Sequence, residues 1–184
     1  MLKPAARPLT TDDFRQLPEG PPYYQLIEGE LFMSPSPIRY HQDILQNACF
    51  HLRGYLERNP IGTIHIAPSD VELSDLNVYE PDLYFVSNRR KSILTKQGAA
   101  GAPNMVLEIL SPRTAKLDKG VKKDIYARTG VEELWIADPS CKELSIFVLQ
   151  ESTEQPKSVF KGRQKVVSSL FPSLDLTVSA LFRA

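Results

Sequence analysis

The sequence predicts an α/β domain in which a mixed central β-sheet is flanked by helices. From Tyr40 to Glu57, apolar residues recur every three or four positions, which is the pattern of an amphipathic helix. Residues 104–110 form a nearly continuous apolar run, as expected of a strand that is covered on both faces. The stretch from Met105 to Ala137 is patterned as strand, helix and strand with short loops, which predicts a parallel pair with a right-handed crossover.

Shorter segments complete the predicted sheet, and the turns that join them favour antiparallel neighbours. Two strand-like pieces between Tyr24 and Met33 meet at a glycine, and a helix-like pattern after the apolar run ends at Gly130. Residues 98–101 are expected in a loop, and the tail after Val159 is too weakly patterned to predict any element. The remaining strands are expected at Thr63–Ala67, Asp70–Leu73, Asp82–Val86, Glu133–Ala137 and Leu144–Leu149.

A length of 184 residues favours one domain with one core. Residues 1–22 contain five of the fifteen prolines and few large apolar side chains, so we interpret them as an N-terminal arm. The one helix-like start in this arm is at residues 10–14, where a threonine is a suitable N-cap. Residues 23–184 are then expected to form the single domain.

Composition narrows the class of protein. Apolar residues make up 42% of the chain and charged residues 24%, as in ordinary globular proteins. We find no apolar run near the roughly 20 residues that cross a bilayer and no signal-like N-terminus, so we expect a cytoplasmic protein without a membrane partner. Cys49 and Cys141 have no disulfide or zinc spacing and are expected to be free thiols. The 22 basic and 22 acidic residues balance, which counts against a strongly basic DNA-binding surface.

Glu108 is the most informative residue, because it puts a carboxylate within the apolar run of residues 104–110. Burying that charge alone would cost several kcal/mol, so a partner is expected. Asp82 follows Pro81 at the start of a predicted strand. If the two strands run antiparallel, the two carboxylates converge within reach of one Mg²⁺ or Mn²⁺ ion. The alternatives are that Glu108 faces solvent or meets a buried arginine, and that Asp82 only caps its strand.

A lysine on the helix after the apolar run completes the candidate catalytic set. At about 100° per residue, Lys122 lies about 100° from the apolar seam of that helix, whereas Lys116, Lys119 and Lys123 lie about 140° to 160° from it. Lys122 is therefore at the edge of the buried face, where an ammonium could stabilise developing charge or orient an attacking water. The alternative is a surface ion pair with Asp118, worth a few tenths of a kcal/mol.

An aspartate, a buried glutamate and a nearby lysine are the outline of the PD-(D/E)XK nuclease site. That superfamily has its lysine two residues after the acidic residue, where this chain has Leu110. In one branch the lysine is thought to come from the following helix, and the sequence resembles that branch, the Uma-two family of endonucleases, over about residues 23–150. The matching segments are residues 24–31, His41 at the start of the first long helix, and residues 78–82, 101–112, 118–122 with Tyr126, and 130–136.

The resemblance implies a restriction-endonuclease-like fold, with Asp82 and Glu108 as metal ligands and Lys122 as the migrated lysine. It implies little about the substrate, because the endonuclease label of the family rests largely on fold analogy. Four residues are candidates for a place behind the metal ligands: Glu30, His41, Asp70 and Tyr126. For Glu30, His41 and Asp70 the alternative is a purely structural role. Arg89, Arg90 and Lys91 are candidates for phosphate contacts, and the alternative for them is a solvated loop.

The function that these observations predict is metal-dependent hydrolysis of phosphodiester bonds in DNA, with Mg²⁺ or Mn²⁺ as cofactor. Two alternatives stay open. One is a module that keeps the nuclease fold for nucleic-acid binding or assembly without turnover, which the neutral charge and the displaced lysine favour. The other is a metal-dependent hydrolase of small phosphate esters. A homodimer is plausible, because two nearby cuts in a duplex need two sites.

Overall fold

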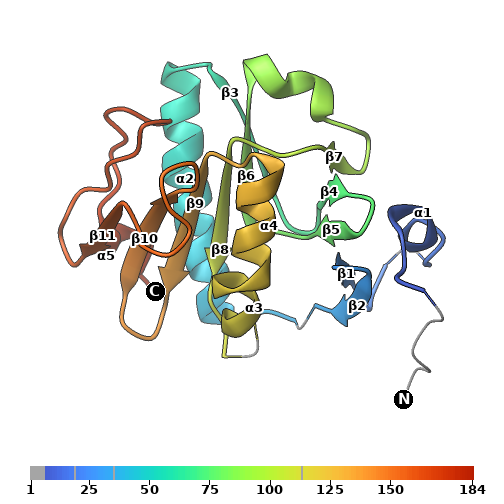
Figure 1. Cartoon of the computed structure of the whole chain (residues 1–184). Coiled ribbons are helices and arrows are strands. Elements are labelled where there is room, and N and C mark those ends of the chain that lie inside the picture. The colour runs from blue at the N-terminus through green and yellow to red at the C-terminus, as the bar shows by residue number, and fades with distance from the viewer. Residues whose placement is uncertain (1–6, 19, 35, 113) are drawn as a thin grey trace.

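A computed structural model describes residues 7–18, 20–34, 36–112 and 114–184. Its strands form two mixed sheets with helices around them (Figure 1). The larger sheet has the strand order β11-β10-β9-β8-β6-β3, in which β8 and β9 are parallel and the other neighbours antiparallel. Its strands are β3 (Gly62–Ile66), β6 (Leu83–Ser87), β8 (Met105–Ile109), β9 (Glu133–Asp138), β10 (Glu143–Val148) and β11 (Ser158–Lys161).

The smaller sheet has the order β2-β1-β5-β4-β7, and only its β4–β7 pair is parallel. Its strands are short, and β7 is an edge strand that pairs Gly98 with Asp70. A Cβ atom at position 98 would lie 2.0 Å from the backbone oxygen of Asp70, so this close pairing requires glycine. The strands are β1 (Tyr24–Ile27), β2 (Glu30–Met33), β4 (Asp70–Ser74), β5 (Asn77–Tyr79) and β7 (Gly98–Ala100).

Alternation along β8 divides the core into two clusters. Met105, Leu107 and Ile109 pack with α2 (Arg39–Arg58) on one face of the larger sheet. Val106 and Leu110 pack on the other face, with α4 and the smaller sheet. The side chain between them, Glu108, therefore points into the second cluster. The other helical segments are α1 (Thr11–Phe14), the 3₁₀ helix η1 (Asn88–Ile93), α3 (Ala115–Lys119), α4 (Val121–Thr129) and α5 (Val178–Leu181).

The predicted class is confirmed, because mixed sheets are flanked by helices and β8 and β9 form the parallel pair expected of the crossover. The strands are divided between two sheets, where the sequence pattern was interpreted as one. After β3 the chain turns away at Ala67, and β4 pairs with β5, which in turn pairs with β1, instead of continuing the larger sheet. Residues 98–100 form β7 and not a loop, because β4 offers its free edge to them.

The predicted helix after β8 is interrupted at Gly120, whose φ of −112° and ψ of −114° lie outside the helical region. It therefore forms α3 and α4. Gly130 ends α4 in the left-handed conformation expected of a glycine C-cap, with φ of 98°. No helix within the described residues is long and apolar enough to span a bilayer.

The N-terminal segment packs against the smaller sheet. Thr10 caps α1 in a capping box with Asp13, as the sequence indicates. The backbone N–H of Thr11 donates to Asp75 over 2.7 Å, and the Arg15 guanidinium lies 2.6 Å from Glu72 on β4. Residues 9–15 are thus attached to the smaller sheet at more than one point.

A buried carboxylate fixes the C-terminal segment to the larger sheet. Glu133 on β9 is only 1% exposed. It accepts hydrogen bonds from Trp135 Nε1 over 2.9 Å, from Ser168 Oγ over 2.7 Å and from the backbone N–H of Ser169 over 2.9 Å. The segment after Val159, for which the sequence predicts no element, is therefore held at Ser168 and Ser169 by a buried carboxylate of the core.

We expect Glu133→Ala to lower the free energy of unfolding by about 3 kcal/mol, because it leaves several buried donors without an acceptor. Urea unfolding monitored by Trp135 fluorescence measures the change. Glu151→Ala removes an exposed carboxylate paired with Lys157 and serves as control, with a loss below about 0.5 kcal/mol. Equal losses in the two variants would contradict the role of Glu133.

Candidate functional site

The register of β6 and β8 brings Asp82 and Glu108 to the same end of the sheet. Leu83 pairs with Leu107 in antiparallel register, so Asp82 and Glu108 are the next residues along the two strands. Asp82 is fixed there by the backbone N–H of Ile109, which donates to Oδ2 over 2.7 Å. Both residues alternate along their strands with Leu83 and Leu107 of the first core cluster, so both side chains point to the face of the second cluster. The antiparallel arrangement expected from the sequence is confirmed.

Glu108 is buried, and its partners among the described residues are a lysine and a tyrosine. The buried arginine that was the alternative partner in the sequence analysis is not among them. Lys122 Nζ lies 2.6 Å from Glu108 Oε1, and the Tyr126 hydroxyl donates to the same oxygen over 2.6 Å. Burial raises the pKa of the Glu108 carboxyl, and the Lys122 charge acts in the opposite direction. Both helical partners come from α4, one turn apart, so a single helix face neutralises this carboxylate.

Lys122 has a side chain only 3% exposed, which agrees with its predicted place beside the buried seam. Its ammonium lies 3.0 Å from Asp118 Oδ1 as well as close to Glu108. Burial alone would lower the pKa of Lys122, but the charges of the two carboxylates outweigh burial and raise it. Asp118 was expected only in a surface pair. The structure makes it the third member of a buried ion cluster, because the Lys122 ammonium contacts both its carboxylate and that of Glu108.

His41 holds Asp82 from the other side of the sheet. Its Nε2 lies 3.3 Å from Asp82 Oδ2 and 3.2 Å from the carbonyl oxygen of Ile109. Both neighbours are acceptors, so Nε2 carries the proton. Burial lowers the pKa of His41, but the hydrogen bond and charge of Asp82 outweigh it and the net shift is upward. Within the described residues, His41 Nδ1 is the one buried side-chain polar atom without a hydrogen-bond partner.

The two carboxylates share a feature that suits a cation site. Asp82 is held through Oδ2 and Glu108 through Oε1, and the described residues make no recorded hydrogen bond to Asp82 Oδ1 or Glu108 Oε2. The described part of the chain brings together no group of three or more His, Cys, Asp or Glu side chains that could hold a metal ion. A cation here would complete its shell with water or substrate oxygens, as Mg²⁺ commonly does.

Glu80 is a neighbour of this site that sequence reasoning missed. Burial and then the charge of Asp70 raise the pKa of Glu80 to about 7. The charge of Asp82 also raises it, whereas the charge of Lys122 lowers it. The signal was available, because Glu80 precedes Asp82 by two residues and residues two apart on an extended chain share a face.

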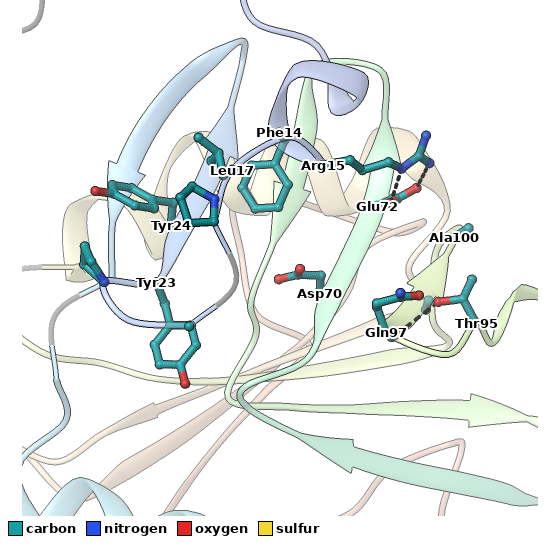
Figure 2. Close-up of a pocket in the computed structure, with 15 residues that line it drawn as sticks. Phe14, Arg15, Leu17, Tyr23, Tyr24, Asp70, Glu72, Thr95, Gln97 and Ala100 are labelled. Atoms are coloured by element: carbon teal, nitrogen blue, oxygen red, sulfur yellow. Dashed lines mark hydrogen bonds and ion pairs between the residues drawn. The ribbon is translucent and has the colours of Figure 1, made fainter.

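The other candidates are divided by their surroundings. Tyr126 and His41 contact the acidic pair directly, whereas Glu30 is exposed on edge strand β2 and Asp70 faces a separate pocket (Figure 2). Arg90 Nη1 donates to the carbonyls of residues 102, 103 and 130, and its Nη2 lies 2.9 Å from Glu132 Oε1, so this side chain braces the loops around it. The exposed candidates for phosphate contact that are left on η1 are Arg89 and Lys91.

The two mixed sheets and their helices form a nuclease-like α/β fold. A crystal structure titled as a putative nuclease belonging to DUF820 from Anabaena variabilis has the same fold, with a TM-score of 0.79 and 24% sequence identity over 95% of this chain and 98% of that chain. The chain belongs to the Uma2 family, described as "Putative restriction endonuclease", whose profile matches residues 11–179. The family resemblance predicted from the motifs is thereby confirmed. No curated protein matches the sequence.

We expect Lys122→Met to lower the free energy of unfolding by about 3 kcal/mol at pH 8, because two buried carboxylates lose their cation. Without the ammonium, the pKa of the Glu108 carboxyl rises further above its unfolded value of about 4.3. The folded variant then binds protons more readily than the unfolded chain, so its stability recovers as the pH falls. Urea unfolding at pH 5 and pH 8 should show the smaller deficit at pH 5.

Lys116→Met is the matched control for this measurement, because Lys116 is exposed on the neighbouring helix α3. Its effect should stay within about 0.5 kcal/mol at both pH values. A deficit in the Lys122 variant that is the same at pH 5 and pH 8 would mean that uncompensated carboxylates are not its cause.

Proposed function

We propose that this protein is a metal-dependent endonuclease that hydrolyses phosphodiester bonds in DNA, with Asp82 and Glu108 binding Mg²⁺ or Mn²⁺. The observation that carries the proposal is a pair of carboxylates on adjacent strands that face the same way, each with one oxygen to which the described residues make no hydrogen bond. Hard cations prefer such oxygen ligands. Membership of a family described as restriction endonucleases supports a nucleic acid as the substrate.

The chain's own residues have distinct parts in this proposal. The Ile109 N–H and His41 orient Asp82, so that its second oxygen is directed without a loss of side-chain freedom at the moment of binding. Lys122 provides the nearest buried positive charge, which can stabilise negative charge that develops on a phosphate beside Glu108. A bound divalent cation would supply Lewis-acid activation of the phosphate and of water.

One observation favours the alternative of a nuclease-fold module that binds nucleic acid without turnover. Lys122 and Tyr126 already satisfy Glu108 Oε1, and Lys122 is also shared with Asp118. A carboxylate that is neutralised by the chain itself has less need of a metal ion. Metal binding therefore separates the two functions before any activity is measured.

We expect calorimetric titration to detect Mn²⁺ binding to the wild-type protein, and Asp82→Asn and Glu108→Gln to abolish it. Cleavage of supercoiled plasmid or single-stranded DNA in Mn²⁺ should fall at least about 100-fold in both variants. Glu151→Gln, an exposed carboxylate away from the site, should leave both measurements unchanged.

The outcomes discriminate among the candidate functions. DNA binding without Mn²⁺ binding or cleavage would overturn the enzyme in favour of the binding module. Cleavage of a nucleotide or a small aryl phosphate in the absence of DNA cleavage would identify a phosphate-ester hydrolase. Metal-dependent cleavage that survives both substitutions would remove Asp82 and Glu108 from the active site.

A further inference from the structure

A cavity of about 430 Å³ lies between the N-terminal segment and the smaller sheet. Its walls are Phe14, Leu17 and Tyr23 on one side and strands β4 and β7 on the other (Figure 2). The volume is within the range of sites for small ligands. The β4–β7 wall is fixed by the close backbone pairing of Asp70 with Gly98. This cavity is distinct from the Asp82 and Glu108 site.

The charge of the cavity is set by Asp70. Arg15 is the one cationic side chain among the lining residues, and it is already paired with Glu72 over 2.6 Å and with Asp12 over 2.9 Å. Asp70 makes no recorded hydrogen bond or ion pair with the described residues, although it is half-buried. Figure 2 shows its carboxylate directed into the middle of the lining residues. Burial and then the charge of Glu72 raise the pKa of Asp70, as expected of a carboxylate without a counter-ion.

Aromatic rings form the rest of the binding surface. Phe14, Tyr23 and Tyr24 line the cavity, and Tyr23 is 43% exposed, so part of its ring is open to a ligand. Aromatic faces attract organic cations through the ring quadrupole, and a nearby carboxylate adds a charge-assisted hydrogen bond. A phosphate would instead be repelled by Asp70 and Glu72. One unpaired carboxylate among aromatic rings is also a poor ligand set for a metal ion.

We propose that this cavity binds an organic cation through a primary ammonium or guanidinium group, with Asp70 as counter-ion and Tyr23 and Phe14 as the aromatic wall. The ligand would thus supply the positive charge that Asp70 lacks in the chain itself. This proposal does not depend on the proposed nuclease function, because neither Asp82 nor Glu108 lines this cavity.

Agmatine, which carries both cationic groups, is the probe for a calorimetric titration of the full chain. We expect a dissociation constant of about 1 mM or tighter for the wild-type protein, in keeping with so small a ligand. Asp70→Asn should weaken binding at least about 10-fold, and Tyr23→Ala about 3-fold. Asp75→Asn alters an exposed carboxylate that does not line this cavity and should leave binding unchanged.

Thermal unfolding without ligand gives an independent measurement. Asp70→Asn keeps the side-chain shape and removes a partly buried charge, so its midpoint should equal or exceed that of the wild type. A lower midpoint would show that the carboxylate already has a stabilising partner and would overturn the proposal. Absence of agmatine binding to the wild type at millimolar concentration, unchanged affinity in folded Asp70→Asn and Tyr23→Ala, or tighter binding of deoxycytidine monophosphate than of agmatine would also overturn it.

Discussion

The buried ammonium of Lys122 is the constraint on which the arrangement around β8 depends. It neutralises Glu108 over 2.6 Å and Asp118 over 3.0 Å, in a cluster where all three side chains are almost completely removed from water. Each of these charges would be costly to bury alone, and the cluster is tolerable only because the three are held in contact. The contact in turn requires α3 and α4 to lie directly over the strand. Packing of that face of the larger sheet therefore follows from electrostatic compensation as much as from apolar contact.

The same neutralisation of Glu108 by Lys122 opposes the proposed binding of a metal ion there. A carboxylate that is satisfied by lysine and tyrosine is a weaker metal ligand than an unpaired one, so a cation at Glu108 must use its second oxygen or displace Lys122. Conflicts between local satisfaction and function are expected at functional sites, where stability is sacrificed for reactivity. Burial also raises the pKa of the Glu108 carboxyl, which disfavours the ionised form that a cation would need.

Sequence patterns were sufficient to identify residues whose place is set by the strand or helix that contains them. Glu108 was identified because a charge interrupts an apolar strand, and Lys122 because its helical phase differs from that of its neighbours; the burial of both agrees, whereas their catalytic roles stay predictions. The division into two sheets was not predictable, because the residue pattern of β4 and β5 indicates strands but does not specify which strands pair with them. Strand β7 lacks β-branched residues and forms because Gly98 can approach β4 closely. The contacts of Arg90 were not predictable either, because its partners are the backbone carbonyls of residues 102 and 130 and the carboxylate of Glu132.

The end of β8 is held from both faces of the sheet, which bears on how precisely the candidate site is built. His41 reaches it from α2, bonding Asp82 and the Ile109 carbonyl, while Lys122 and Tyr126 reach Glu108 from α4. The Ile109 N–H closes the arrangement by donating to Asp82. Because these contacts come from helices and strands and not from loops, the two carboxylates are fixed before any ligand arrives. A change in either helix would therefore move one carboxylate relative to the other, and binding of the proposed metal ion would be weakened even where the fold survives.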